Sequence, residues 1–323
     1  MQTLLQKIGH LRILVIGDLM LDHYIWGDAT RISPEAPVPV VQVERDTFTA
    51  GGAANVALNL RALGAAVDLV GTVGADRDSA RLDQVLEPHT LVLDAALRST
   101  ARPTIIKTRV MCRSQQLCRL DREAKPADYA LPEAWIEAEL APRIAAADAV
   151  ILSDYAKGVV TTELIRRVQK LAGPDKLVSL DPKPRPSLRF HGLGLITPNR
   201  NEALLLANFQ SAGTAENFGL DAICQRLYTE YATRLLVVTL GADGMLISRE
   251  GRVDRQVPTA ARAVFDVSGA GDTVTAVLTA ALAAGADAEA AVQLANLAAG
   301  VVVAKLGTAT ASPQEILAHA QKL

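Results

Sequence analysis

The sequence predicts an α/β fold in which helices flank a mostly parallel sheet. Short runs rich in β-branched residues alternate along the chain with longer amphipathic stretches, as expected of βαβ units. The chain has 323 residues, half of them hydrophobic, so its core needs no disulfide or metal for stability. We expect a single domain over residues 1–323, with a second, smaller sheet at one end.

The expected strands of the main sheet are short and mostly apolar. Residues 12–16 have the length and composition of a buried strand, and residues 65–73 are expected to form another single strand. Runs of the same character follow at 149–152, 177–180, 195–196 and 235–239. The stretches between them carry apolar residues at helical spacing. The expected helices are 53–60, 133–145, 161–171, 215–231, 271–284, 288–303 and 314–321.

Two segments do not fit a parallel core. Residues 24–42 contain three prolines and a β-like run, and residues 103–120 alternate polar and apolar side chains. Both patterns indicate strands exposed on one face. Two interpretations stay open. The segments, taken as about 23–49 and 103–122, pair into a small lid sheet over the end of the main domain, or they form surface loops with edge strands.

Composition narrows the classes of function. Thirty-three Lys and Arg residues oppose 35 Asp and Glu residues, and a net charge of −2 argues against a general nucleic-acid binder. No apolar run approaches the roughly 18 residues of a membrane span. The three cysteines form no CxxC motif, which favours free thiols in a reducing compartment. We therefore expect a cytoplasmic protein with no nucleic-acid or membrane partner.

Familiar nucleotide-binding motifs are absent from the sequence. No glycine is followed by lysine, which excludes a Walker A P-loop. No G-x-G-x-x-G run occurs, so a nicotinamide dehydrogenase is disfavoured. There is also no G-x-S-x-G nucleophile elbow.

The sharpest motif is Asp266-Val-Ser-Gly-Ala-Gly-Asp-Thr273, which leads into a helix of small residues. Glycines at a helix start expose unpaired backbone N–H groups that bind a phosphoryl group or a developing anion. Asp272 lies in the first turn, where a carboxylate can take a proton from an attacking hydroxyl. On spacing alone, Asp272 could equally complement the helix dipole and do nothing more.

Two motifs near the N-terminus supply candidate polar contacts. Residues 50–57 place a glycine pair before a helix and Asn55 one turn into it, where both can meet a polar ligand. Asp18 directly follows the first strand, and a second carboxylate lies four residues on. Ligands of open α/β sheets bind at such strand ends, where carboxylates can hold sugar hydroxyls. Each motif also suits an ordinary turn or cap.

Two later motifs suit a nucleotide site. Asn199 and Glu202 have capping-box spacing, and Glu202 can also stand near a metal–phosphate centre. Residues 237–244 end a strand in a glycine-bearing turn, which suits a base or ribose lying on backbone. Local structure alone accounts for both patterns.

In order and spacing, these motifs resemble the ribokinase (PfkB-type) family of sugar kinases. The glycine pair with Asn55, then Asn199-x-x-Glu202, then Asp266-x-x-Gly-Ala-Gly-Asp272 follow one another as in that family, over residues 13–307. The resemblance implies a ribokinase-like, Rossmann-like domain with a small β lid. It also implies an ATP-dependent phosphotransferase acting on a sugar hydroxyl, and it favours the functional interpretation of each motif.

Further runs resemble the members that phosphorylate C1 of D-glycero-β-D-manno-heptose 7-phosphate to the 1,7-bisphosphate, in ADP-heptose and lipopolysaccharide core synthesis. They are residues 17–27, 31–39, 107–110, 115–116 with 119–121, and 153–158. The proline-rich continuation after residues 181–183 departs from the expected pattern and weakens Lys183 and Arg185 as ligands. The sequence has no HxGH-type motif, so we expect the kinase without a nucleotidyltransferase module. Alternatives are a kinase for ribose or fructose phosphate, or a non-catalytic sugar- or nucleotide-binding regulator.

The resemblance also implies roles for single residues. Asp272 would be the general base on the anomeric hydroxyl, with the backbone of Gly269, Ala270 and Gly271 as anion hole. The expected sugar-phosphate ligands are Asp18, Gly51, Gly52, Asn55, Lys107, Arg109, Asp154 and Lys157. The expected nucleotide contacts are Asn199, Glu202, Thr239, Gly241, Gly244 and Asn296. Glu202 would organise Mg²⁺ through water, and a monovalent cation such as K⁺ would lie at Asp266, Ser268 and Gly307. A homodimer through the lid is also expected.

Overall fold

The protein, seen in a computed structural model, is built around an eight-stranded sheet. The structure describes residues 1–113, 115–209 and 219–322. The parallel strands are β1 (Arg12–Gly17), β4 (Ala66–Val70), β9 (Ala149–Ser153), β10 (Leu177–Asp181), β11 (Leu195–Ile196) and β12 (Leu235–Thr239). Beyond β12, β13 (Met245–Arg249) and β14 (Arg252–Val257) extend the sheet antiparallel. The order β14-β13-β12-β11-β10-β9-β1-β4 confirms the predicted α/β fold with a mostly parallel sheet.

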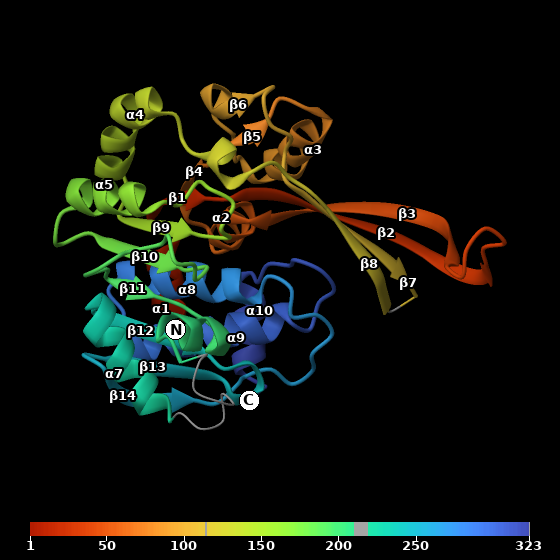
Figure 1. The fold of residues 1–323 in the computed structure, drawn as a ribbon. Coiled ribbons are helices and arrows are strands. Elements are labelled where there is room, and N and C mark those ends of the chain that lie inside the picture. Colours follow the sequence, from red (N-terminus) through yellow and green to blue (C-terminus); the bar gives the residue numbers. More distant parts are fainter. Residues whose placement is uncertain (114, 210–218, 323) are drawn as a thin grey trace.

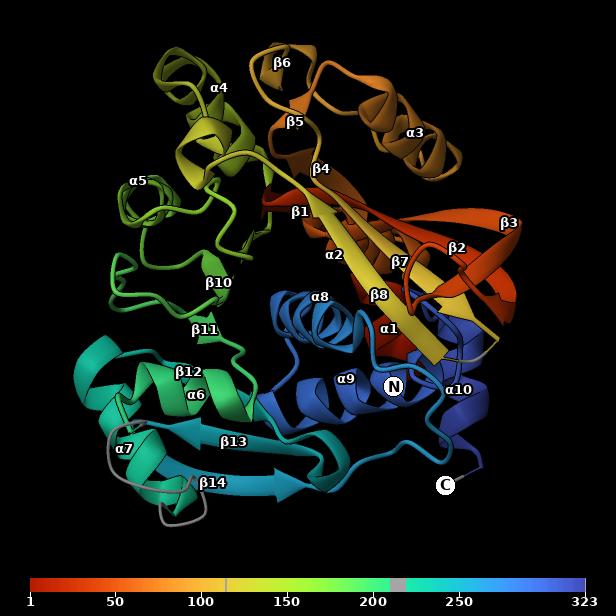
Figure 2. The ribbon, with the colours of Figure 1, turned by 45° about the vertical axis from the view of Figure 1, so that its right-hand side comes forward.

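Helices cover both faces of this sheet (Figure 1) (Figure 2). One face carries α1 (Gln2–Ile8), α2 (Ala53–Ala62), α8 (Ala270–Ala283), α9 (Ala288–Val302) and α10 (Pro313–Ala320). The other carries α4 (Glu133–Ala146), α5 (Thr162–Ala172), α6 (Arg200–Leu206) and α7 (Leu220–Tyr231). The helix α3 (Arg77–Leu86) packs beside β3 and was not expected from the sequence.

Strand β1 shows why the core strands are apolar along their whole length. Ile13 and Val15 belong to the hydrophobic cluster on one face, and Leu14 and Ile16 belong to the cluster on the other. Successive side chains of a strand point to opposite faces, so a strand covered on both sides needs apolar residues at every position. The strand then ends at Gly17, where no side chain fits because a Cβ would lie 2.2 Å from the Ser153 carbonyl oxygen.

A second sheet of four strands projects from the body of the molecule (Figure 1). Its strands, in the order β3-β2-β7-β8, are β2 (Leu19–Ile32), β3 (Pro39–Gly52), β7 (Ile106–Cys112) and β8 (Gln115–Arg122). Strand β2 pairs antiparallel with β3 and parallel with β7. Of the two interpretations of these segments, the small sheet is therefore confirmed and the surface loops are wrong.

The strands of this small sheet are longer than the runs that predicted them. Strand β2 begins at Leu19, almost directly after β1, and its first residues are buried beside the end of β3. Pro34 and Pro37 lie in the connection from β2 to β3, and Pro39 is the first residue of β3, which are positions where a ladder N–H can be missing. The small sheet therefore begins in the core of the molecule, next to Asp18.

One expected strand is wrong in extent. Residues 65–73 form two elements, because β4 ends at Val70 and β5 (Val73–Gly74) pairs separately with β6 (Arg98–Ser99). Gly71 lies between the two strands, where a Cβ would lie 2.4 Å from the Gly17 carbonyl oxygen. The expected helix 215–231 is seen as α7 from Leu220, and its residues 215–218 lie outside the described residues. None of the described helices is long and apolar enough to cross a membrane.

Candidate active site

Carboxylates gather where three parallel strands end. Asp18 follows β1, Asp154 follows β9, and Asp181 ends β10. These strands are neighbours in the sheet, so their carboxyl ends lie along one edge. Asp272, in the first turn of α8, faces the same edge because it accepts a hydrogen bond from Tyr155, the residue after Asp154.

Asp272 is buried and held by two side chains. It is 3% exposed, and its Oδ1 accepts a hydrogen bond from the Tyr155 hydroxyl at 2.5 Å. Its Oδ2 accepts a second one from Asn55 Nδ2 at 2.8 Å. Burial raises the pKa of Asp272 to about 6, against the lowering effect of these two hydrogen bonds. A carboxylate with that pKa is ionised near neutral pH and is basic enough to take a proton.

The start of α8 presents free backbone donors next to Asp272. Gly269 caps the helix with φ +78°, and a Cβ there would lie 2.6 Å from Asn55 Nδ2. The N–H of Ala270, one of the three predicted anion-hole residues, bonds the Val267 carbonyl at 3.2 Å. In the described part of the chain, the N–H groups of Gly271 and Asp272 have no backbone acceptor. They therefore suit an incoming anion.

A cavity of about 430 Å³ opens beside this helix start. Thr239, Gly241, Gly244 and Asn296 line it, together with the Ala270 and Gly271 pair. The structure thus brings together four of the residues predicted at the nucleotide. The cavity is mainly apolar and large enough for a base and ribose, and Gly271, which carries one of the free N–H donors, is among its lining residues.

Asn296 helps to build the cavity wall. Its Oδ1 accepts from the Ala260 N–H at 3.2 Å, and its Nδ2 donates to the Pro258 carbonyl at 2.6 Å. Both polar ends of this side chain therefore hold the chain that follows β14. A role for Asn296 in shaping the cavity is compatible with the sequence prediction, whereas a direct polar contact with nucleotide stays a prediction.

Asn199 and Glu202 form the capping box that their spacing suggested. Asn199 accepts from the Glu202 N–H at 3.0 Å, and Glu202 accepts from the Asn199 N–H at 3.0 Å. Glu202 also pairs with Lys183 Nζ at 3.1 Å. Burial, and then the negative charges of Glu202, Asp272 and Asp154, raise the pKa of Asp181 well above its ordinary value. This crowding of carboxylates suits a divalent cation, although none of the described residues form a three-ligand metal cluster.

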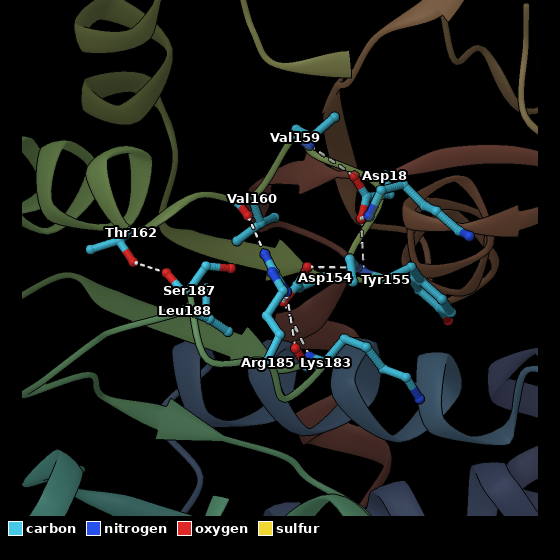
Figure 3. A network of polar contacts seen from close by, with 12 residues as sticks. Asp18, Asp154, Tyr155, Val159, Val160, Thr162, Lys183, Arg185, Ser187 and Leu188 are labelled. Atoms are coloured by element: carbon cyan, nitrogen blue, oxygen red, sulfur yellow. Dashed lines mark hydrogen bonds and ion pairs between the residues drawn. The ribbon is translucent and has the colours of Figure 1, made fainter. Parts of the chain in front are cut away.

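Asp18 and Asp154 hold protein backbone in this structure (Figure 3). Asp18 accepts from the N–H groups of Tyr155 at 2.8 Å and of Lys157 and Val159 at 3.0 Å. Burial raises the pKa of Asp18 in spite of these bonds. Asp154 is bound in the same way, by backbone donors and by Arg185 at 2.5 Å. The predicted contacts of both carboxylates with sugar stay predictions.

The glycine pair before α2 is fixed by close packing. A Cβ on Gly51 would lie 2.5 Å from Asp22 Oδ2. Gly52 has φ +60°, and a Cβ there would lie 2.4 Å from the Asp18 carbonyl oxygen. Gly51 therefore borders the carboxylate of Asp22 and Gly52 borders the backbone of Asp18, whereas their contact with sugar stays a prediction.

Of the predicted basic ligands, Arg109 and Lys157 already have acidic partners. Arg109 pairs with Asp22 at 2.5 Å, and Lys157 pairs with Glu123 at 2.6 Å. Lys107 makes no ion pair among the described residues, and its Nζ lies 5.4 Å from the centre of the Tyr155 ring. Burial lowers the pKa of Lys107. A half-buried lysine near Asp272, with no anionic partner of its own, is suited to an anionic ligand.

The residues predicted for a monovalent cation also meet. Asp266 accepts from the N–H groups of Ser268 and Gly307, each at 2.9 Å. Burial favours a higher pKa for Asp266, but these hydrogen bonds outweigh it and lower the pKa. The carboxylate is therefore ionised, and it ties the loop before α8 to the loop after α9.

Sequence reasoning missed Tyr155 and gave Asp181 no role. Tyr155 lies inside the run 153–158, which was noted only for its resemblance, and nothing in that run points to a contact with a residue 117 positions away. The available signal was positional: a polar side chain directly after a parallel core strand lies at the ligand edge of the sheet.

Comparison with known proteins shows that the chain is similar to a family of carbohydrate kinases. The family model for pfkB family carbohydrate kinase matches residues 10–315. The chain is 41% identical over 314 residues to Bifunctional protein HldE of Desulfatibacillum aliphaticivorans, covering 96% of this chain and 63% of that protein. It is 44% identical over 312 residues to Bifunctional protein HldE of Azotobacter vinelandii, covering 96% and 64%. The chain thus spans somewhat less than two thirds of the length of these relatives.

Solved structures show the same fold. A ribokinase from Thermotoga maritima superposes with a TM-score of 0.74 at 19% identity, covering 96% of this chain and 99% of that one. Phosphofructokinase-2 from Escherichia coli superposes with a TM-score of 0.73 at 18% identity, covering 97% and 99%. At such identities the likeness establishes the ribokinase-like fold alone.

Proposed function

This chain belongs to the pfkB family of carbohydrate kinases, and on that premise we propose that it phosphorylates the anomeric hydroxyl of D-glycero-β-D-manno-heptose 7-phosphate. The transfer from ATP would give the 1,7-bisphosphate. One observation carries the catalytic part: Asp272, with a pKa of about 6, lies in the first turn of α8 beside the free N–H groups of that turn. This arrangement supports a base and an anion site side by side at the ligand edge of the sheet.

Different residues of the site have different roles in the proposed reaction. Asp272 accepts the proton of the sugar hydroxyl as that oxygen attacks the γ-phosphorus of ATP. The N–H groups of Gly271 and Asp272 stabilise the negative charge on the transferring phosphoryl group. The cavity at Thr239 and Gly244 holds the nucleotide. Positioning and charge stabilisation provide most of the catalysis in phosphoryl transfer, so the chain needs no covalent intermediate.

Two groups of residues are suited to bind Mg²⁺ and a monovalent cation. Bound Mg²⁺ would neutralise charge on the phosphates, held through water by Glu202 with Asp181 close by. Potassium would lie at the loop that Asp266 ties together with Ser268 and Gly307. Support for both is the charge and the donor set of these residues together with the family resemblance.

The choice of heptose phosphate as substrate rests on sequence similarity and not on the geometry of the site. The runs 17–27, 31–39 and 153–158 resemble kinases of that sugar, and the relatives that share 41–44% identity over most of the chain carry the name HldE. Because the chain spans only part of those relatives, a second activity of theirs is not assigned to it. The ribokinase and phosphofructokinase structures make ribose and fructose 6-phosphate the sugars to compare.

A sugar panel tests the proposal. ADP release would be measured with Mg-ATP and D-glycero-D-manno-heptose 7-phosphate in each anomer, fructose 6-phosphate, fructose 1-phosphate and ribose. We expect turnover with the heptose phosphate alone, and higher turnover in potassium than in tetramethylammonium salt. Turnover confined to another sugar would contradict the substrate and keep the kinase. ATP binding without turnover on any sugar would favour the non-catalytic regulator.

Lys107 is the side chain we expect to recognise the sugar's phosphate. Its charge has no acidic partner in the described chain, so a Lys107→Ala enzyme should lose a charge-assisted bond of about 1.5–3 kcal/mol. At a pH well above 6, where Asp272 stays ionised without Lys107, the KM for the sugar phosphate should rise by roughly 10- to 100-fold with little change in kcat. Lys170→Ala, on the exposed side of α5, is the matched control. An unchanged KM in Lys107→Ala would move phosphate recognition to another residue.

Three further properties of the chain are proposed. The small sheet exposes Ile32, Val43 and Leu120, which are 65%, 54% and 60% accessible, and a second copy of the sheet would cover them in a homodimer. The cysteines of the chain are free thiols, which suits a cytoplasmic location. The small sheet would also serve as a lid that excludes water from the sugar.

A further inference from the structure

The hydroxyl of Tyr155 has no part in the reaction described so far, although it contacts the proposed base. It lies 2.5 Å from Asp272 Oδ1, at a distance typical of a strong hydrogen bond to a carboxylate. Burial, and then the charges of Asp272 and Asp181, raise the pKa of Tyr155 well above its ordinary value. The phenol therefore keeps its proton at any working pH and acts as the donor in this bond.

The loop that carries Tyr155 is bound through its backbone by Asp18 and Asp154 (Figure 3). Asp18 binds three of its backbone N–H groups, and Asp154 binds the N–H of Ala156 at 2.9 Å. Ala156 has φ +59°, a left-handed conformation that an alanine adopts only when its surroundings impose it. Two buried carboxylates thus maintain a strained turn whose first side chain reaches Asp272.

We propose that Tyr155 is a positioning residue for the base: its phenol donates to Oδ1 of Asp272, fixes the orientation of that carboxylate opposite Asn55, and holds it in the ionised form. The inference rests on the proposed function, because it assumes that Asp272 accepts the proton of the sugar. With Oδ1 bound by Tyr155 and Oδ2 by Asn55, the carboxylate cannot rotate, and its remaining lone pairs point in fixed directions.

The charges around Asp272 show why such a donor is needed. Asp22 and Asp181 lie near enough to oppose its ionisation, and burial opposes it more strongly. Lys107 favours ionisation, as do the two hydrogen bonds. A donor that binds only the carboxylate form lowers its pKa, so removing the donor must raise the pKa of Asp272. The base would then be protonated over a wider range of pH.

Tyr155→Phe removes the hydroxyl and keeps the ring under Lys107. The kcat/KM for the sugar, at saturating Mg-ATP, would be measured from pH 5 to pH 9. The wild-type enzyme is expected to lose activity below about pH 6. In Tyr155→Phe the acid limb should move up by about one pH unit or more, so that kcat/KM falls roughly tenfold further at pH 5 than at pH 8.5.

Two controls separate this role from a structural one. Tyr231→Phe removes another phenol, one that donates to the Leu206 carbonyl far from the site, and should leave the acid limb in place. Thermal melting would show that both variants are folded. The same loss at every pH in Tyr155→Phe, or an unmoved limb with faster ATP hydrolysis in the absence of sugar, would overturn the inference. Turnover retained by Asp272→Asn would instead contradict the proposed function itself.

Discussion

Replacing Asp272 with asparagine is expected to lower kcat by about 10²- to 10⁴-fold while ATP still binds. Asparagine has nearly the same shape but cannot accept the proton of the sugar hydroxyl. The backbone N–H groups at the start of α8 and the cavity at Thr239 do not depend on the side chain of residue 272. ADP release with the heptose phosphate and calorimetric titration with Mg-ATP measure the two properties separately.

Replacing Asp272 with asparagine should also change how the stability of the protein depends on pH. The folded-state pKa of Asp272 is raised to about 6, so this carboxyl stabilises the fold at low pH and loses that contribution as pH rises through about 6. Asparagine does not titrate. The melting temperature of the wild-type protein should therefore fall relative to that of Asp272→Asn between pH 5 and pH 8. An equal pH dependence of the two proteins would mean that Asp272 is not buried as described.

Replacing Asp18 with asparagine is expected to reduce both stability and activity. Asp18 is fully buried, and its two oxygens accept from the backbone N–H groups of Tyr155, Lys157 and Val159. An amide NH₂ would point donors at donors and leave one or two N–H groups unsatisfied, at about 1–3 kcal/mol each. The loop would then release Tyr155 from Asp272. Urea denaturation and kcat should both show the loss, with kcat lower by at least about tenfold.

The control for Asp18 is another aspartate that binds backbone N–H. Asp287 caps α9 by accepting from the Ala290 N–H at 2.8 Å, and asparagine caps helices about as well as aspartate. Asp287→Asn should therefore change the free energy of unfolding by less than about 0.5 kcal/mol. If Asp18→Asn were as stable as Asp287→Asn and only raised the KM for sugar, Asp18 would bind the sugar directly, as its place in the sequence first indicated.

The strands of the small sheet were predicted only in part from the pattern of polar and apolar residues. Alternation of polar and apolar residues in 103–120 correctly predicted strands, but the predicted single exposed face is wrong, because β8 is exposed at every position and β7 is partly exposed along most of its length. It did not predict that β2 starts at Leu19, because the first residues of β2 are apolar on both sides and resemble a core strand. Whether such a run joins the main sheet or leaves it depends on partners far along the chain, here Gly52 and Ile106.

For Glu202 and Asp272, the local sequence pattern is the same whether the residue only caps a helix or also belongs to the site. The capping box of α6 accounts for Asn199 and Glu202 completely, and the dipole of α8 would account for Asp272. Only their neighbours distinguish the roles. Asp272 is enclosed by Tyr155 and Asn55 and has its pKa raised, whereas an aspartate that merely complemented a dipole would be exposed to solvent.

By itself the sequence determined the fold class, the family and the order of the site motifs, because these depend on hydrophobic periodicity and on glycines and carboxylates at fixed local spacing. Tertiary structure alone decided how deeply Asp272 is buried, which carboxylates hold backbone, and that Tyr155 donates to Asp272. Those properties depend on burial and on donors brought together from β1, β9 and α8, segments more than 100 residues apart. A pKa and a hydrogen-bond partner are set by such neighbours in space, which local sequence does not contain.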